Sequence, residues 1–145
     1  MVTLSYPATL EPETKGRGYV VKFSDLPEAL TGGRTLPESL REAADCLGSA
    51  LSFRMLDKTE IPLPSKVRKG QIPVQVPFSV APKVALYMAM RQLGITNVEL
   101  ARRLGCRETV IRRMLDPKHA SRPESLQNAL AVPGKTITLR LDDAA

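Results

Sequence analysis

The sequence predicts an α+β protein in which a small N-terminal sheet crossed by one helix precedes a C-terminal helical bundle. Three observations support this fold class. Short runs in the first 80 residues alternate in hydropathy, and one long amphipathic segment follows them. The segment 96–115 has the pattern of two helices joined at a glycine. Positions 1–65 contain seven Lys and Arg against nine Asp and Glu, whereas positions 66–145 contain fourteen against six.

This division of charge predicts two modules with different partners, at residues 1–80 and 81–145. The content of 43% hydrophobic and 25% charged residues is typical of a folded soluble protein. The sequence contains no apolar run of membrane-spanning length and no signal peptide, so we expect a cytoplasmic protein. Cys46 and Cys106 are expected to be buried free thiols. His119 is the only histidine, and we expect neither a metal site nor a cofactor.

Alternation in the N-terminal module predicts strands at residues 2–6, 19–23, 31–34 and 72–78. A polar loop is expected at residues 11–18. The last strand contains Pro73 and Pro77, which lack ladder donors, so we place it at an edge of the sheet. The expected order is therefore β-β-β-α-β.

One long helix is predicted between the third and fourth strands, ending near Lys58. Thr35 and Glu38 have the spacing of a capping box, and Pro37 lies in the first turn, where its missing N–H is tolerated. Gly48 in the helix interior is expected where the helix packs closely on the sheet. The module contains no glycine-rich phosphate loop and no nucleophile–base pair, so we expect no catalytic residues and no enzyme activity.

The segment 96–115 predicts a helix-turn-helix. Thr96 is expected to cap a helix over residues 97–104, with Glu99 completing a capping box, and Gly105 is expected to turn the chain. The second helix has an apolar stripe that contains Ile111 and Met114, and its opposite face is basic. This pattern is typical of a helix that enters a DNA major groove, although an ordinary helical hairpin with a solvated basic face is the alternative.

Other elements complete the C-terminal module. A helix is expected at residues 82–93, and Ser121 with Glu124 has the spacing of a third capping box before a short helix. Residues 135–141 alternate again, which predicts a strand. An isolated strand needs a partner for its backbone, and we expect the same strand of a second subunit. The alternative is pairing with the sheet of the same chain.

The predicted helix-turn-helix suggests which side chains would contact DNA. Base edges are expected to face Arg107, Glu108, Thr109 and Arg112. Phosphates are expected to contact Thr96, Asn97, Arg102, Arg113 and Lys118. Two such units about 34 Å apart would match a palindromic operator.

The sequence resembles a known family in both modules. The N-terminal module resembles the front domain of HicB-type antitoxins in its pattern of residues. The matching positions are Tyr6-Pro7, Gly18-Tyr19, Val21, Phe23, Asp25-Leu26-Pro27 and Thr31-Gly32. The back resembles the Cro- and lambda-repressor-like helix-turn-helix of one HicB subgroup. Asn97 and Arg107 depart from the family pattern, and so does Glu28-Ala29-Leu30 after the Leu-Pro pair. The resemblance therefore implies no operator sequence.

The resemblance implies a partial ribonuclease H-like front domain without nuclease activity. It also implies a HicA-type toxin partner, a small mRNA-cleaving ribonuclease, and repression of the operon that encodes both proteins. It names no toxin-binding residues. A stand-alone transcriptional regulator whose front module senses a ligand or another protein is the alternative function.

Overall fold

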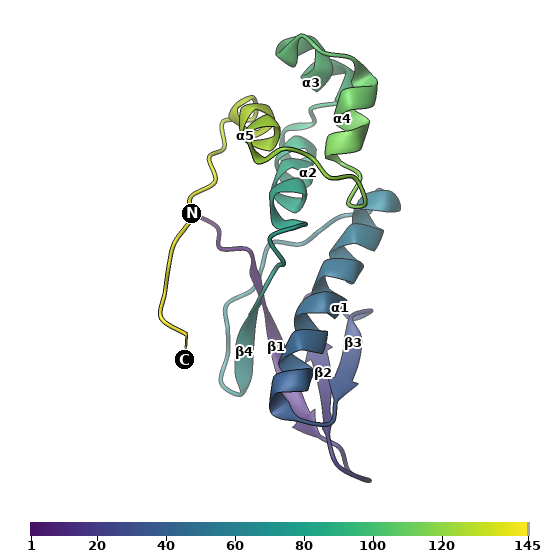
Figure 1. Cartoon of the computed structure of the whole chain (residues 1–145), viewed down its shortest axis with the longest axis vertical. Coiled ribbons are helices and arrows are strands. Elements are labelled where there is room, and N and C mark those ends of the chain that lie inside the picture. The colour runs from purple at the N-terminus through teal and green to yellow at the C-terminus, as the bar shows by residue number, and fades with distance from the viewer. Residues whose placement is uncertain (145) are drawn as a thin grey trace. The chain divides into compact units, whose positions relative to one another are not determined.

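The computed structural model describes residues 1–144, and these divide into two compact units, Met1–Ala81 and a second that begins at Pro82. The first unit contains a four-stranded sheet and one long helix, and the second contains four helices (Figure 1). The elements, in chain order, are β1 (Ser5–Pro12), β2 (Tyr19–Phe23), β3 (Leu30–Gly33), α1 (Leu36–Leu56), β4 (Gln71–Gln75), α2 (Ala81–Leu93), α3 (Asn97–Leu104), α4 (Glu108–Met114) and α5 (Pro123–Ala131).

The sheet has the strand order β3-β2-β1-β4, and every neighbouring pair is antiparallel. The predicted β-β-β-α-β order is confirmed, and so is the edge position of β4. Pro73 is tolerated in β4 because an edge strand has a neighbour on one side only. Helix α1 lies along one face of the sheet (Figure 1). Buried side chains of α1, including Leu47 and Leu51, form a core with Tyr6, Val21 and Phe23 of the strands.

The predicted bounds of the first and fourth strands are wrong, and the third strand is shifted by one residue, to Leu30–Gly33. The first strand was expected at residues 2–6, but β1 begins at Ser5 and continues through the start of the expected polar loop to Pro12. The central position of β1 explains this, because β2 pairs with its second half and β4 with its first half. The fourth strand ends at Gln75 rather than at residue 78, since the ladder with β1 runs out there.

Helix α1 has the predicted start. The Glu38 N–H donates to Thr35 Oγ1 over 3.2 Å, and the Glu38 carboxylate accepts from the Arg34 N–H over 3.1 Å. The helix ends at Leu56, two residues before the expected end. Gly48 is buried, and a Cβ at this position would lie 3.2 Å from Cγ of Pro77. The expected close approach therefore exists, but the residue that requires it follows β4 and is not in the sheet.

The two cysteines are free but only half-buried, so the expectation of buried thiols is wrong. Cys46 lies on α1, whereas Cys106 lies in the turn after α3. Burial nevertheless raises the pKa of the Cys46 thiol. Among the helices of residues 1–144, none is long and apolar enough to cross a membrane.

Candidate nucleic-acid interface

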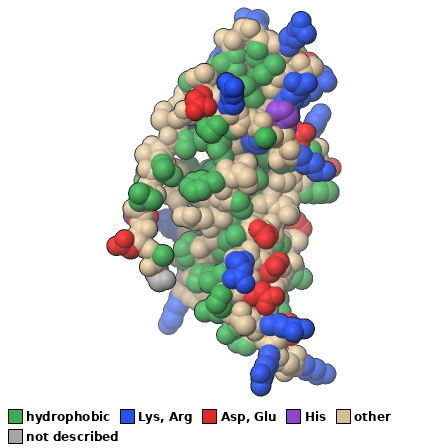
Figure 2. Space-filling view, viewed as in Figure 1, with side chains coloured by type: hydrophobic (Ala, Val, Ile, Leu, Met, Phe, Trp, Pro, Cys, Tyr) green, Lys and Arg blue, Asp and Glu red, His purple; other side chains and the backbone are tan. Residues whose placement is uncertain are grey.

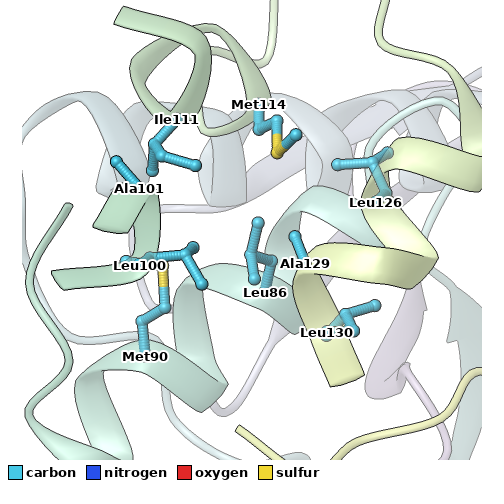
Figure 3. Close-up of a cluster of buried hydrophobic side chains, with 9 residues drawn as sticks. All are labelled: Leu86, Met90, Leu100, Ala101, Ile111, Met114, Leu126, Ala129 and Leu130. Atoms are coloured by element: carbon cyan, nitrogen blue, oxygen red, sulfur yellow. The ribbon is translucent and has the colours of Figure 1, made fainter. Parts of the chain in front are cut away.

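A single apolar cluster holds α3 and α4 in the second unit. Each of the four helices contributes to it, and the side chains converge between them (Figure 3). The buried members are Leu86, Met90, Leu100, Ala101, Ile111, Met114, Leu126, Ala129 and Leu130. Helix α4 has only seven residues, too few to be stable in isolation, so this cluster determines where it lies.

Helix α3 has the predicted bounds and the predicted terminal residues. Thr96 Oγ1 accepts from the Glu99 N–H over 3.1 Å, which satisfies one free donor of the first turn. Gly105 adopts the left-handed conformation with φ 67° and ψ 34°, as the turn requires. The Glu99 carboxylate bonds Arg103 over 2.7 Å, and the structure gives it no bond to the Thr96 N–H. Only half of the predicted capping box is therefore present.

Helix α4 divides into the two predicted faces. Ile111 and Met114 are buried in the cluster. The opposite face is exposed at Arg107, Thr109, Arg112 and Arg113, and Glu108 is half-buried. Arg107 is the N-cap residue, and its side chain makes no capping hydrogen bond. The exposed polar side chains are thus available to a ligand along the length of α4.

Two of the four predicted base-contacting residues bind each other. Glu108 Oε1 accepts from Nε of Arg112 over 3.2 Å and from NH2 over 3.1 Å. The pair spans one helical turn, and the Arg112 side chain is 65% exposed. An ion pair of this spacing on a helix surface contributes about 0.2–0.5 kcal/mol. An incoming guanine edge would have to separate the two side chains before Arg112 could bond it.

The predicted phosphate-contacting residues lie around the two helices. Thr96 uses its hydroxyl for the cap, and Asn97 is half-buried at the first position of α3. Arg102 and Arg113 are exposed in the last turns of α3 and α4, and Lys118 is exposed in the following loop. Figure 2 shows Lys and Arg side chains gathered over α3 and α4. Such a surface attracts polyanions through counterion release.

Lys83 is not among the predicted site residues, and its side chain is only 2% exposed on α2. Its Nζ donates to the carbonyl oxygens of Arg113 (3.0 Å) and Asp116 (2.8 Å) and to Ser121 Oγ (3.0 Å). Burial lowers the pKa of Lys83 below its usual value, and the Asp116 carboxylate opposes part of this shift. The sequence signal was a lysine three residues before Leu86, inside the apolar face of the helix.

The contact with Lys83 also shows that the predicted capping box at Ser121 is wrong. Ser121 does not cap α5, because its hydroxyl lies at Lys83 Nζ and 3.3 Å from His119 Nδ1. Arg122 is the N-cap residue instead, without a side-chain capping bond, and Pro123 occupies the first turn as expected. The local spacing predicted the helix, but a residue distant in sequence determines where the serine side chain lies.

The residues 135–141 form no strand in the described chain. Ile137, Leu139 and Leu141 are exposed by 40, 71 and 92%, and the sheet contains only β1 to β4. The alternative of pairing with the sheet of the same chain is therefore not observed. The alternating apolar side chains are left exposed in the single chain.

The first unit contains polar links but no cluster suited to a metal ion among residues 1–144. The Tyr6 hydroxyl donates to the Pro62 carbonyl oxygen over 2.7 Å, and Ser65 bonds the Asp25 carboxylate through its hydroxyl and its N–H. The Asp25 carboxylate therefore holds the segment that connects α1 and β4. These links fix the connection between α1 and β4 to the sheet.

Comparison with known proteins places this architecture in a family. A family model described as the HicB-like antitoxin of bacterial toxin–antitoxin systems matches residues 5–85, which is more than half of the chain. The chain belongs to the HicB-like antitoxin family. Proteins of this family are antitoxins and not enzymes, and their toxin–antitoxin systems imply a toxin partner for this chain.

Several HicB antitoxins match most of this chain. Antitoxin HicB of Escherichia coli strain K12 is 42% identical over 136 residues, which cover 94% of this chain and 98% of that protein. Antitoxin HicB 1 of Photorhabdus laumondii is 40% identical over 139 residues, covering 96% and 88%. Antitoxin HicB of Pseudomonas fluorescens is 32% identical over 122 residues, covering 83% and 84%. The similarity therefore includes both units of this HicB-like chain.

Proposed function

We propose that this HicB-like antitoxin binds and inhibits a HicA-type mRNA-cleaving toxin through residues 1–80 and represses its own operon through residues 81–145. The observation that carries the proposal is the order of the two units. The region matched by the antitoxin family model is followed by the helices α3, which Thr96 caps, and α4, which has an exposed basic face. Both activities belong in the cytoplasm, where mRNA and operator DNA are present.

In this proposal α4 is the recognition helix of a Cro-like helix-turn-helix. Arg107, Glu108, Thr109 and Arg112 face base edges, and a bidentate arginine–guanine pair contributes ~1–3 kcal/mol of discrimination. The phosphate contacts come from Thr96, Asn97, Arg102, Arg113 and Lys118, and they orient the protein without reading sequence. The burial of Ile111 and Met114 and the exposure of the arginines support this orientation of α4.

The first unit inhibits the toxin by covering its RNA-binding surface. It is a partial ribonuclease H-like domain in this proposal, a description supported by the order β1-β2-β3-α1-β4. Inhibition by covering needs a rigid surface, and the bonds of Tyr6 and Asp25 to the segment before β4 provide one.

A homodimer places two copies of α4 on one operator. Residues 135–141 of each subunit pair across a two-fold axis, which would satisfy their backbone groups and cover Ile137, Leu139 and Leu141. The support is the alternation of these residues together with their exposure in the single chain. DNA-binding dimers of this kind recognise half-sites one helical turn apart, at about 34 Å.

Two assays on purified protein test the proposal. We expect the full chain to copurify with the product of the adjacent reading frame and to stop that product from cleaving RNA. We also expect it to retard a duplex that carries the promoter of its own operon. Unchecked RNA cleavage in its presence would refute the antitoxin role. Promoter binding without any effect on an RNA-cleaving neighbour would instead support the stand-alone regulator.

A further inference from the structure

Lys83 is a buried cation that neither the apolar core nor the proposed base and phosphate contacts account for. It lies in the first turn of α2 and is 2% exposed. Met90, two helical turns further along the same face of α2, belongs to the apolar cluster. Burying an ammonium group is costly unless each of its protons has an acceptor, so its presence here requires an explanation.

All three ammonium protons of Lys83 have acceptors. Two of these acceptors are the carbonyl oxygens of Arg113, in the last turn of α4, and of Asp116, just after this helix. The third is Ser121 Oγ, at the end of the loop that follows. The Arg113 carbonyl oxygen also accepts from the Asp116 N–H over 3.2 Å, and carbonyls at a helix C-terminus carry partial negative charge, so a cation stabilises them.

The loop that Lys83 holds has few other fixed points. Asp116 accepts from the His119 N–H at its carbonyl oxygen (3.1 Å) and from the Lys118 N–H at Oδ1 (2.9 Å). His119 and Ser121 are linked through their side chains. Lys83 thus connects α2 to two backbone carbonyls before Lys118 and to the Ser121 hydroxyl after it, in the loop that leaves the C-terminal end of α4.

We infer that Lys83 is a positioning residue for DNA binding, which fixes the C-terminal end of α4 and the following loop so that Arg113 and Lys118 reach the phosphates. This inference rests on the proposed DNA-binding function. The apolar contacts of Ile111, in the middle of α4, and of Met114, its last residue, are non-directional. Three hydrogen bonds from a buried donor are directional, so they fix the height and rotation of the helix end.

The matched variants are Lys83→Met and Met90→Ala. Lys83→Met keeps an unbranched apolar side chain and removes the three donors. Met90→Ala destabilises the same helix from the same face and leaves the hydrogen bonds of Lys83 to Arg113, Asp116 and Ser121 in place. Binding to a duplex carrying the promoter of the operon is measured by fluorescence anisotropy over a range of salt concentrations. The temperature is chosen so that circular dichroism shows both variants folded.

We expect Lys83→Met to weaken promoter binding about tenfold and to reduce the slope of log K against log salt by roughly 1 to 2, the loss of one or two phosphate contacts. Met90→Ala is expected to stay within about twofold of the unsubstituted protein, with the same slope. A Lys83→Met protein with unchanged affinity and slope would overturn the inference. So would a loss in Met90→Ala equal to that in Lys83→Met, since it would show general destabilisation.

A second measurement separates this inference from the proposed function. Amide hydrogen exchange of the full chain without DNA is expected to accelerate at residues 116–121 in Lys83→Met and to stay unchanged there in Met90→Ala. Unchanged exchange in Lys83→Met would overturn the anchoring role even if promoter binding is confirmed. If the unsubstituted protein fails to bind the promoter, the proposed repressor function fails, and exchange still decides whether Lys83 anchors the loop.

Ser121→Ala serves if Lys83→Met does not fold. It removes one acceptor of the three and leaves the ammonium bonded to both carbonyls. We expect an affinity loss of about two- to threefold with faster exchange at residues 117–121. Unchanged affinity and exchange in this variant would contradict the positioning role.

Discussion

Tyr6 shows how one buried polar side chain joins the sheet to the rest of the first unit. Its hydroxyl donates to the Pro62 carbonyl oxygen in the segment between α1 and β4. Burial, followed by the repulsion of the Asp25 carboxylate, raises the pKa of Tyr6 to about 12, although Arg54 opposes this shift. The phenol therefore stays protonated in the folded state at pH values where it ionises in the unfolded chain.

This pKa predicts a loss of stability at alkaline pH. Below about pH 10 the hydroxyl is protonated in both states, and its full contribution is present. Between pH 10 and 12 only the unfolded chain loses the proton, so the free energy of unfolding falls by about 1.4 kcal/mol per pH unit in that window. Urea unfolding at pH 9 to 11.5 measures it. Tyr6→Phe should flatten the dependence, whereas the control Tyr19→Phe should retain it; equal slopes in both variants would contradict the assignment.

Glu108 makes a second prediction at the residue scale. Its carboxylate holds the Arg112 guanidinium, and its negative charge would repel the phosphates of any bound duplex. Glu108→Gln removes this charge and releases Arg112, so we expect tighter binding to random duplex DNA and a smaller ratio of promoter to random affinity. Competition binding at fixed salt measures the ratio. Glu124→Gln, at the start of α5, is the control for the change in net charge, and an equal effect in both variants would refute a specific role for Glu108.

Individual elements show which features a sequence predicts well. The bounds of α3 follow from Thr96, Glu99 and Gly105, because caps act within one turn of the helix. The prediction of a third capping box at Ser121 was wrong, because the Ser121 hydroxyl accepts a hydrogen bond from Lys83, 38 residues away. The predicted bounds of β1 were wrong for a similar reason, because they depend on which segments of β2 and β4 pair with this strand. Contacts within one helical turn can therefore be predicted from the sequence, whereas contacts between residues distant in sequence cannot.

The candidate site divides in the same way. The alternation of buried and exposed residues along α4 followed from helical spacing. Glu108 and Arg112 pair at the i,i+4 spacing, which is visible in the sequence. Both side chains were nevertheless predicted to face base edges. Lys83 was missed because a lysine near the start of an amphipathic helix is ordinarily solvent-exposed.

The C-terminal segment carries a prediction at the element scale. Removal of residues 135–145 should convert a dimer into a monomer in sedimentation velocity, because the paired strands would be lost. Promoter affinity should then fall at least tenfold, since one subunit reaches one half-site. A substitution of Leu139 by Thr keeps the strand propensity and removes exposed apolar surface, so it should weaken the dimer less. A truncated chain that stays dimeric would contradict the proposed strand pairing.

The two units together form a molecule with an uneven distribution of charge. The sequence predicted this from the net charge of about −2 over residues 1–65 and +8 over residues 66–145. A basic C-terminal unit suits a polyanionic ligand, whereas the first unit matches the antitoxin family. The account therefore assigns each activity to one unit and expects the two to be separable by substitution.

Arg112→Ala provides the most direct test of this central claim, with two readouts on the same protein. We expect the variant to lose at least tenfold in affinity for the promoter duplex and to inhibit RNA cleavage by the neighbouring toxin as well as the unsubstituted chain does. Arg41→Ala, on the exposed face of α1 in the first unit, is the charge-matched control and should retain promoter binding. If Arg112→Ala bound the promoter with unchanged affinity and salt dependence, α4 would not be the recognition helix. If the variant lost toxin inhibition together with DNA binding, the two activities would not belong to separate units.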